Sequence, residues 1–386
     1  MGAPIHRSYP LTKKAIAWEL LPDRRDSTRR SAPDREEDMR VEERGILAQA
    51  AVAAGALVLS LALTSGAARA QDKTYVMKIT LPTLHDTVHQ VALNWAAAVE
   101  KDSGGRIKVQ VYPASQLGSI PRQIEGVQFG SIQALLIPPE FMVGVDPRFE
   151  VMAAPGLVNS MKHGQRVATD PAVLKLMLGL GANKGLHGVG LFMATPSSII
   201  SKTPIRHLAD FKGKKIRIFA SKFQSVAFER LGITPVAMSL ADVLPALQQG
   251  AIDGADAALN VYVPMHFVDA AKYVTQTDQP AIFIIMEVSQ KWFDTLPKDL
   301  QQIVDRDGAT ESVKINPWGL DFRHKMQKAW VAQGGELIDL PANEQAQMMK
   351  TLASVGEDVS KNNPSLHEAY ETVVAAAKRT EQGPSQ

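Results

Sequence analysis

The chain has 386 residues, a length that allows two or three domains. Apolar residues make up 45% of it, charged residues 21%, and the formal net charge is +2, which argues against a largely disordered chain, a polytopic membrane protein and a basic nucleic-acid-binding protein. The sequence contains no cysteine, which excludes disulfide bonds, thiolate metal sites and a cysteine nucleophile.

A targeting segment is predicted before the folded part of the chain. Residues 1–44 are rich in charge, whereas residues 45–68 carry none and lead into the A-x-A pattern Ala68-Arg69-Ala70. We interpret residues 1–70 as an N-terminal extension plus a secretory signal peptide cleaved after Ala70, with a retained membrane anchor as the alternative. Residues 1–38 are interpreted as an over-extended start without a role in the fold.

The mature chain, residues 71–386, shows alternating strand and helix patterns. Strands are expected at Tyr75–Leu81, Ile107–Tyr112, Gln133–Ile137, Gly188–Met193, Ser198–Ser201, Lys215–Phe219 and Ala281–Val288, and helices at Asp86–Lys101, Ser119–Phe129 and from Ser239 to Gln249. A capping box, Ser239 to Asp242, is expected to open the last of these helices. This order predicts an α/β protein with mostly parallel sheets covered by helices, and a ligand site at the carboxyl ends of strands or between two such domains.

The C-terminal third is expected to be helical. Pro297 opens a long helical stretch that reaches at least Trp330, and Pro317 inside it is expected to produce a kink. Residues 376–386 are interpreted as a polar tail.

Motifs for catalysis or metal binding are weak. His85 and His89 share one helical face, the spacing of a metal site, but Asp86 follows where a zincin has Glu. We therefore expect Asp86 to cap a helix, with a ligand-facing His85 and a zinc site as the less favoured alternatives. The sequence has no G-x-S-x-G elbow, P-loop or G-x-G-x-x-G motif, so no enzyme, cofactor or metal is predicted.

Arg217 is the strongest single candidate for ligand binding. It lies inside the alternating strand Lys215–Phe219, on the face opposite Ile216 and Ile218. One interpretation is a solvent-exposed sheet edge. The other is a guanidinium at a strand end that offers its planar fork to a carboxylate.

Five motifs occur in order along the mature chain. They are Tyr112–Gly118 (YPASQLG), Pro204–Arg217 (PIRHLADFKGKKIR), Leu231–Met238 (LGITPVAM), Ala246–Gly254 (ALQQGAIDG) and Ser289–Pro297 (SQKWFDTLP). Together they resemble the signature segments of the DctP-type family of TRAP-transporter solute-binding proteins over nearly all of the mature chain.

The resemblance implies a periplasmic binding protein of two α/β lobes that close on a small organic acid, with a long helix crossing both lobes. It implies lobe I at 71–195 with 283–322 and lobe II at 196–282 with 323–375, closing about crossovers near Thr195–Ser198 and Gln279–Phe283. It also implies that Arg217 pairs with the substrate carboxylate and that a TRAP permease in the membrane receives the ligand.

Departures from the family pattern narrow the expected ligand. Ser197 stands where many members have a second arginine, and Ala257 where an asparagine commonly meets the ligand. With one cation and few polar clamps, a monocarboxylate is favoured over a dicarboxylate. Further ligand contacts are expected from Phe219, Phe223, Ser197, Asp256, Asn260, Glu140 and His85, although Phe223 is equally suited to a helix core and Asn260 to a helix cap.

Three alternatives remain open at this stage. Glu140 and Asp256 are candidates to hold a cation that bridges the carboxylate. The protein is also a candidate to feed a signalling receptor instead of a permease, or to be an enzyme on the same two-lobe fold. The ligand's identity and the oligomeric state do not follow from the sequence.

Overall fold

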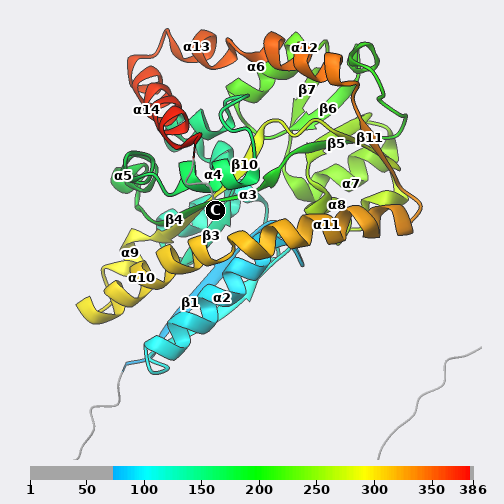
Figure 1. Cartoon of the computed structure of the whole chain (residues 1–386). Coiled ribbons are helices and arrows are strands. Elements are labelled where there is room, and N and C mark those ends of the chain that lie inside the picture. Colours follow the sequence, from blue (N-terminus) through cyan, green and yellow to red (C-terminus); the bar gives the residue numbers. More distant parts are fainter. Residues whose placement is uncertain (1–72, 383–386) are drawn as a thin grey trace, which may run out of the picture. The chain divides into compact units, whose positions relative to one another are not determined.

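The computed structural model describes residues 73–382, within a compact unit that spans Asp72–Gln386 (Figure 1). The predicted extension, the signal peptide and the end of the polar tail lie outside the described residues. Within residues 73–382, no helix is both long enough and apolar enough to cross a membrane.

The first of two sheets has five strands in the order β2-β1-β3-β10-β4, and we call it, with the helices packed on it, lobe I. Strand β10 pairs antiparallel with both neighbours, and it alone among the described strands of this sheet runs against the others. Its strands are β1 (Tyr75–Thr80), β2 (Ile107–Tyr112), β3 (Ala134–Ile137), β4 (Leu186–Pro196) and β10 (Ala281–Ser289). Its helices are α2 (Thr87–Asp102), α3 (Ile120–Phe129), η2 (Pro139–Met142), η3 (Pro147–Ala153), α4 (Met161–Ala168), α5 (Pro171–Gly179), η4 (Ala182–Lys184), α9 (Gln290–Phe293) and α10 (Lys298–Lys314).

The second sheet has six strands in the order β11-β9-β5-β8-β6-β7, and it forms lobe II. Only β5 among its described strands runs against the others. Its strands are β5 (Ser198–Ser201), β6 (Lys215–Ile218), β7 (Thr234–Ala237), β8 (Gly254–Ala257), β9 (Tyr273–Gln276) and β11 (Glu336–Asp339). Its helices are η5 (Leu208–Phe211), α6 (Lys222–Arg230), α7 (Leu240–Gln249), α8 (Leu259–Tyr262), η6 (Phe267–Asp269), α12 (Ala342–Leu352) and α13 (Val355–Ser360).

Both sheets are covered on both faces, as the expected fold class requires. Along β10, Phe283 and Ile285 join one apolar cluster while Ile284 and Met286 join the cluster on the opposite face. The sequence of a strand that is buried on both faces is a continuous run of apolar residues, which explains why β10 was recognisable in the sequence. The two reversed strands leave each sheet mostly parallel, as predicted.

Two strand passages connect the lobes, at the predicted places. β4 ends at Pro196 and β5 begins at Ser198, while β9 ends at Gln276 and β10 begins at Ala281. A third connection is helical: α11 (Asn316–Ala332) contacts β4 of lobe I and also α8 and β11 of lobe II. Figure 1 shows α10 and α11 running one after the other past both sheets.

Three sequence expectations are corrected. The stretch after Pro297 is two helices that meet at Ile315, and Pro317 lies in the first turn of α11, where its missing N–H costs no hydrogen bond. The C-terminal third is not all helical, because β11 follows α11 and pairs with β9. No side-chain capping bond is formed at Ser239 within the described chain, and α7 starts with a backbone bond from Asp242 N to Ser239 O instead.

The last helix, α14 (Pro364–Thr380), packs against η3, α4 and α5. These elements contact β4 or β10 of the five-stranded sheet. The contacts of α14 therefore favour lobe I for this helix, against the expected placement of 323–375 in lobe II. The exact lobe boundaries stay a prediction.

Candidate functional site

The candidate site is a cavity of about 40 Å³ between the two lobes. It lies where β1, β3, β6 and β8 end, as expected for open α/β sheets. Lobe I contributes Pro82, Thr83, Asp86, Thr87, Val88, Ile120, Leu136, Pro138, Phe141, Ala194, Thr195, Ile282 and Ile284; lobe II contributes Arg217, Phe219, Leu240, Ala257, Ala258, Asn260 and Val261.

Arg217 is the one cation among the lining residues, and it is fully buried. Strand β6 places it between β7 and β8, so the alternative of a solvent-exposed edge is wrong. Its Nε donates to the Met238 carbonyl at 3.0 Å and its Nη1 to the Asp256 carbonyl at 2.9 Å. Nη2 has no hydrogen-bond partner among residues 73–382, so one donor of the fork remains for a ligand.

Aromatic rings fix the plane of the guanidinium. The Arg217 Cζ lies 4.7 Å from the centre of the Phe219 ring and 5.8 Å from that of Phe141. The two rings are themselves 5.3 Å apart. Both contacts favour the charged form of the guanidinium.

Burial lowers the pKa of Arg217 to about 10, and the charge of Asp256 opposes that shift. The guanidinium therefore stays cationic at neutral pH. Burial also raises the pKa of Asp256 to about 7, against hydrogen bonds and the charge of Arg217. Asp256 Oδ2 accepts a 2.6 Å hydrogen bond from Gln224 Nε2, which holds this carboxyl behind the cavity wall.

Glu140 is a second buried acid close enough to interact with Asp256. Burial raises its pKa to about 8, and the charges of Asp256 and Glu150 add to the rise. Neither Glu140 nor Asp256 lines the cavity. A bridging cation at this pair stays a prediction.

The predicted site residues fall into two groups. Arg217, Phe219 and Asn260 line the cavity, whereas Phe223, Ser197, Asp256, Glu140 and His85 do not. Asn260 lies inside α8 and is not the cap, which is Ala258.

The residues away from the cavity have other contacts. Phe223 is buried in the apolar cluster of lobe I with its ring 6.0 Å from that of Tyr370, the helix-core alternative. Ser197 Oγ donates to the Gln279 carbonyl at 2.8 Å, at the strand crossover. His85 is exposed. Its backbone N–H donates to His89 Nδ1 at 3.1 Å.

The helix-cap interpretation of Asp86 is confirmed. Its Oδ1 accepts from His89 N and from Thr83 Oγ1, both at 2.9 Å. Burial raises its pKa to about 6, while these hydrogen bonds oppose the rise. The sequence analysis did not predict three residues of the cavity wall, namely Thr83, Thr87 and Phe141. Of these, Thr83 and Thr87 lie beside or within the HDTVH segment, residues 85–89, that the sequence analysis considered.

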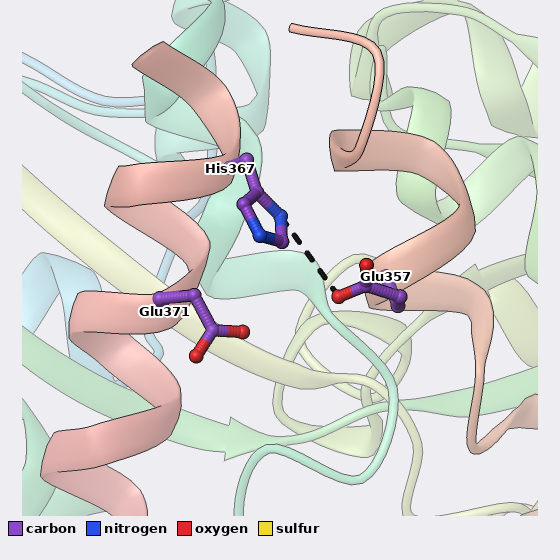
Figure 2. A group of neighbouring side chains, drawn as sticks. All are labelled: Glu357, His367 and Glu371. Carbon is purple, nitrogen blue, oxygen red and sulfur yellow. Dashed lines mark ion pairs between the residues drawn. The ribbon is translucent and has the colours of Figure 1, made fainter. Parts of the chain in front are cut away.

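A separate group of metal-ligating residue types lies away from the cavity. Glu357 on α13 and His367 and Glu371 on α14 place one possible ligand atom each within 4.8 Å of one another (Figure 2). His367 Nδ1 is 3.9 Å from Glu357 Oε2 and 3.0 Å from Ser360 Oγ, so this ring nitrogen already has a partner. In the described part of the chain, no group of three such residues includes His85 and His89, which argues against the zinc alternative.

Three hydrogen bonds join the lobes beside the cavity, and we call them the interlobe bonds. Glu150 of η3 accepts from Ser221 Oγ at 3.1 Å and Lys222 N at 2.5 Å, at the N-terminus of α6. Asn260 Nδ2 donates to Thr87 Oγ1 at 3.2 Å. In each case the two partners belong to different lobes, so the lobes are in contact around the site.

We expect ligand binding to close the lobes about the two strand passages near Thr195–Ser198 and Gln279–Phe283. We expect the interlobe bonds to form only when the lobes approach, and so to add to this closure. Small-angle scattering is expected to show a smaller radius of gyration at saturating ligand than without it. An unchanged radius would contradict hinge closure.

A model of the bacterial extracellular solute-binding protein family 7, DctP, matches residues 80–362. The chain belongs to this family. DctP proteins are extracellular solute-binding proteins and not enzymes, in agreement with the expected function class and periplasmic location.

Relatives and solved structures support the assignment. Protein YiiZ of Salmonella typhimurium, which is uncharacterized, is 31% identical over 54% of this chain and 64% of its own length. The C4-dicarboxylate-binding periplasmic protein DctP of Rhodobacter capsulatus is 26% identical over 80% of this chain and 92% of its own.

Two crystal structures of binding proteins, the first of them a TRAP periplasmic solute binding protein, share the fold. One is from Shewanella oneidensis with bound succinate (TM-score 0.73, 21% identity, 79% of this chain and 99% of the other). The other is the sugar acid binding protein DctPAm of Advenella mimigardefordensis with galactonate (TM-score 0.73, 21% identity, 80% and 99%). The predicted two-lobed α/β class is therefore confirmed.

Proposed function

We propose that this DctP-family protein captures a small organic acid in the periplasm through its carboxylate and delivers it to a TRAP permease. The observation that carries the proposal is the buried cation Arg217, which lines a mostly apolar interlobe cavity and keeps Nη2 for a ligand. Leaving a cation buried without a counterion is costly, so an anionic ligand is the expected complement. The relatives named for C4-dicarboxylates, succinate and galactonate also bind organic acids.

The expected ligand is a monocarboxylate. Ser197 turns its hydroxyl to the Gln279 carbonyl, and Ala257 brings only a methyl group to the cavity. Arg217 is thus left as the single cation among the lining residues. A second carboxylate of the ligand would be desolvated without a charged partner there, which disfavours dicarboxylates.

A thermal-shift screen of organic acids against residues 71–386 tests the proposal. Ligand at one hundred times its dissociation constant stabilises the folded state by about 2.7 kcal/mol, which is a readily measured shift. We expect monocarboxylates to raise the melting temperature and dicarboxylates of the same carbon number to do so less. A screen in which only uncharged or cationic compounds stabilise the protein would contradict carboxylate capture, and transport of the identified acid by the co-encoded permease in vesicles would test delivery.

Affinity for the acid is expected to fall as pH rises from 6 to 9. The pKa values of Asp256 (about 7) and Glu140 (about 8) lie in this interval, and their ionisation adds negative charge near Arg217 while the ligand is already anionic. The expected loss is about tenfold, corresponding to about 1.4 kcal/mol of added repulsion. Calorimetry across the interval measures it. Glu140→Gln is expected to flatten the upper part of the profile, and a profile that is flat in the unmodified protein would show that neither acid acts on the ligand.

A further inference from the structure

The polar groups that line the interlobe cavity are mostly satisfied by the protein itself. Thr83 Oγ1 donates to Asp86 Oδ1 at 2.9 Å, and Thr195 Oγ1 donates to the Pro196 carbonyl at 3.2 Å. Within residues 73–382, two buried atoms of the lining side chains have no partner, namely Arg217 Nη2 and Asn260 Oδ1. The cavity therefore offers a ligand one cationic donor and one neutral acceptor.

The side-chain amide of Asn260 is oriented so that its oxygen, Oδ1, has no hydrogen-bond partner among residues 73–382. It lies on α8 and is 2% exposed, and its Nδ2 donates across the cleft to Thr87 Oγ1 at 3.2 Å. This bond uses the amide nitrogen and fixes the orientation of the amide plane. A buried carbonyl-type oxygen costs free energy unless it accepts a hydrogen bond.

A carboxylate cannot supply that hydrogen bond, because an ionised carboxylate only accepts. The donor must come from another part of the ligand. Most of the rest of the wall is apolar, with Val88, Leu136, Phe141, Ile282 and Ile284 among its members. A ligand with one hydroxyl on an apolar body complements this wall. Several hydroxyls or a second carboxylate would instead be buried against apolar side chains without hydrogen-bond partners.

We propose that the ligand is a hydroxy monocarboxylate with an apolar body, and that Asn260 Oδ1 reads its hydroxyl. This inference rests on the proposed function, because both assign the binding of the ligand's carboxylate to Arg217. Asn260 is then the residue that determines specificity, and Arg217 supplies charge recognition. The hydroxyl is read in the closed form, in which Thr87 orients the Asn260 amide.

Matched pairs of acids test the proposal by calorimetry. The pairs are 3-hydroxybutyrate with butyrate and 2-hydroxyisovalerate with isovalerate, so that each pair differs by one oxygen atom. We expect the hydroxy acid of at least one pair to bind about 10- to 100-fold more tightly, because its analogue leaves the buried Asn260 oxygen unsatisfied. Succinate, which adds a carboxylate instead of a hydroxyl, is expected to bind more weakly than either hydroxy acid.

Two variants separate the reading of the hydroxyl from the closing of the lobes. Asn260→Leu removes the acceptor, so the affinity ratio within the pair is expected to fall to within threefold of one. Thr87→Val is the matched control. It removes the same cross-lobe bond but keeps Asn260 Oδ1, so both acids are expected to weaken and the ratio is expected to fall less than in Asn260→Leu. If Asn260→Leu lowers the melting temperature of the ligand-free protein by more than about 5 °C, Asn260→Ala replaces it as the variant that lacks the acceptor.

The possible results distinguish failure of hydroxyl recognition from failure of carboxylate capture. If both acids of each pair bind equally to the unmodified protein, carboxylate capture stands and the reading of a hydroxyl is overturned. A ratio retained in both Asn260 variants would also overturn it. If none of the acids binds at millimolar concentration, this inference fails, while the thermal-shift screen decides the proposed function separately.

Discussion

Arg217→Ala is expected to weaken binding of the identified acid by about 30- to 4,000-fold. The variant removes a charge-assisted pair in a desolvated cavity and leaves the ligand carboxylate without a cation, a truncation that costs about 2–5 kcal/mol. Arg217→Lys is expected to fail in large part as well. An ammonium group keeps the charge but cannot donate at once to the Met238 and Asp256 carbonyls and to the ligand, as the three guanidinium nitrogens do.

The same contacts predict a second effect on the ligand-free protein. With Arg217 replaced by Ala, the buried carbonyls of Met238 and Asp256 lose their donors, so the free energy of unfolding is expected to fall by about 1–3 kcal/mol. Melting of each variant without ligand controls for this loss. Lys215→Ala is the matched control for binding, because Lys215 lies on the same strand with an exposed side chain, and its affinity is expected to stay unchanged. Calorimetry in which Arg217→Ala binds within threefold of the unmodified protein would place the anchor elsewhere.

Replacing Glu287 with Met is expected to stabilise the protein by about 1–3 kcal/mol at pH 8. Glu287 is fully buried on β10, and neither of its carboxylate oxygens finds a hydrogen-bond partner in the described part of the chain. Its neighbours Leu135 and Gly188 on β3 and β4 offer no side-chain polar group. Methionine is unbranched and close in size, so it removes the polar group without opening a cavity.

The pH dependence of that gain follows from the pKa. Burial raises the pKa of Glu287 well above its ordinary value of 4.5, so the folded protein binds a proton that the unfolded chain releases. Stability is then lost as pH rises from about 4.5 through the folded-state pKa, because deprotonation favours the unfolded chain. The advantage of Glu287→Met should therefore be smallest near pH 4.5 and grow with pH. Urea titrations at pH 5 and pH 8 measure it, with Glu287→Gln as the uncharged control; an advantage that shrinks with pH would refute this account.

Most of the fold was predictable where local patterns are strong. The apolar run of β10 and the alternating residues of β2 and β6 identified these strands within a residue or two. The four-residue strands β7, β8, β9 and β11 were not predicted, because none of them has the apolar run or the strict alternation of the strands that were found. Such a segment gains its stability from its neighbours and not from its own sequence. The side on which α14 packs was equally hidden, since an amphipathic helix does not reveal which sheet covers it.

The candidate site was predictable only in part for the same reason. Arg217 was found because its strand position and a recognisable segment coincide. Thr87 and Phe141 belong to loops and helix ends of the other lobe, and no local pattern connects them to Arg217. Asp256 was expected at the ligand, yet it lies behind the wall, where Gln224 holds its carboxyl and burial raises its pKa. Which atom of a motif faces the cavity depends on tertiary packing that the motif does not contain.

The interlobe bonds at Glu150 and Asn260 allow affinity and selectivity to change separately. A ligand that binds only the closed form has an observed dissociation constant equal to its intrinsic value divided by the closed fraction. The carboxylate of Glu150 lies outside the cavity and touches Ser221 and Lys222, so its replacement alters that fraction for every ligand alike. Sequence change at Glu150 can therefore adjust the protein to the concentration of its ligand, or hasten release of that ligand, while the set of molecules it recognises remains the same.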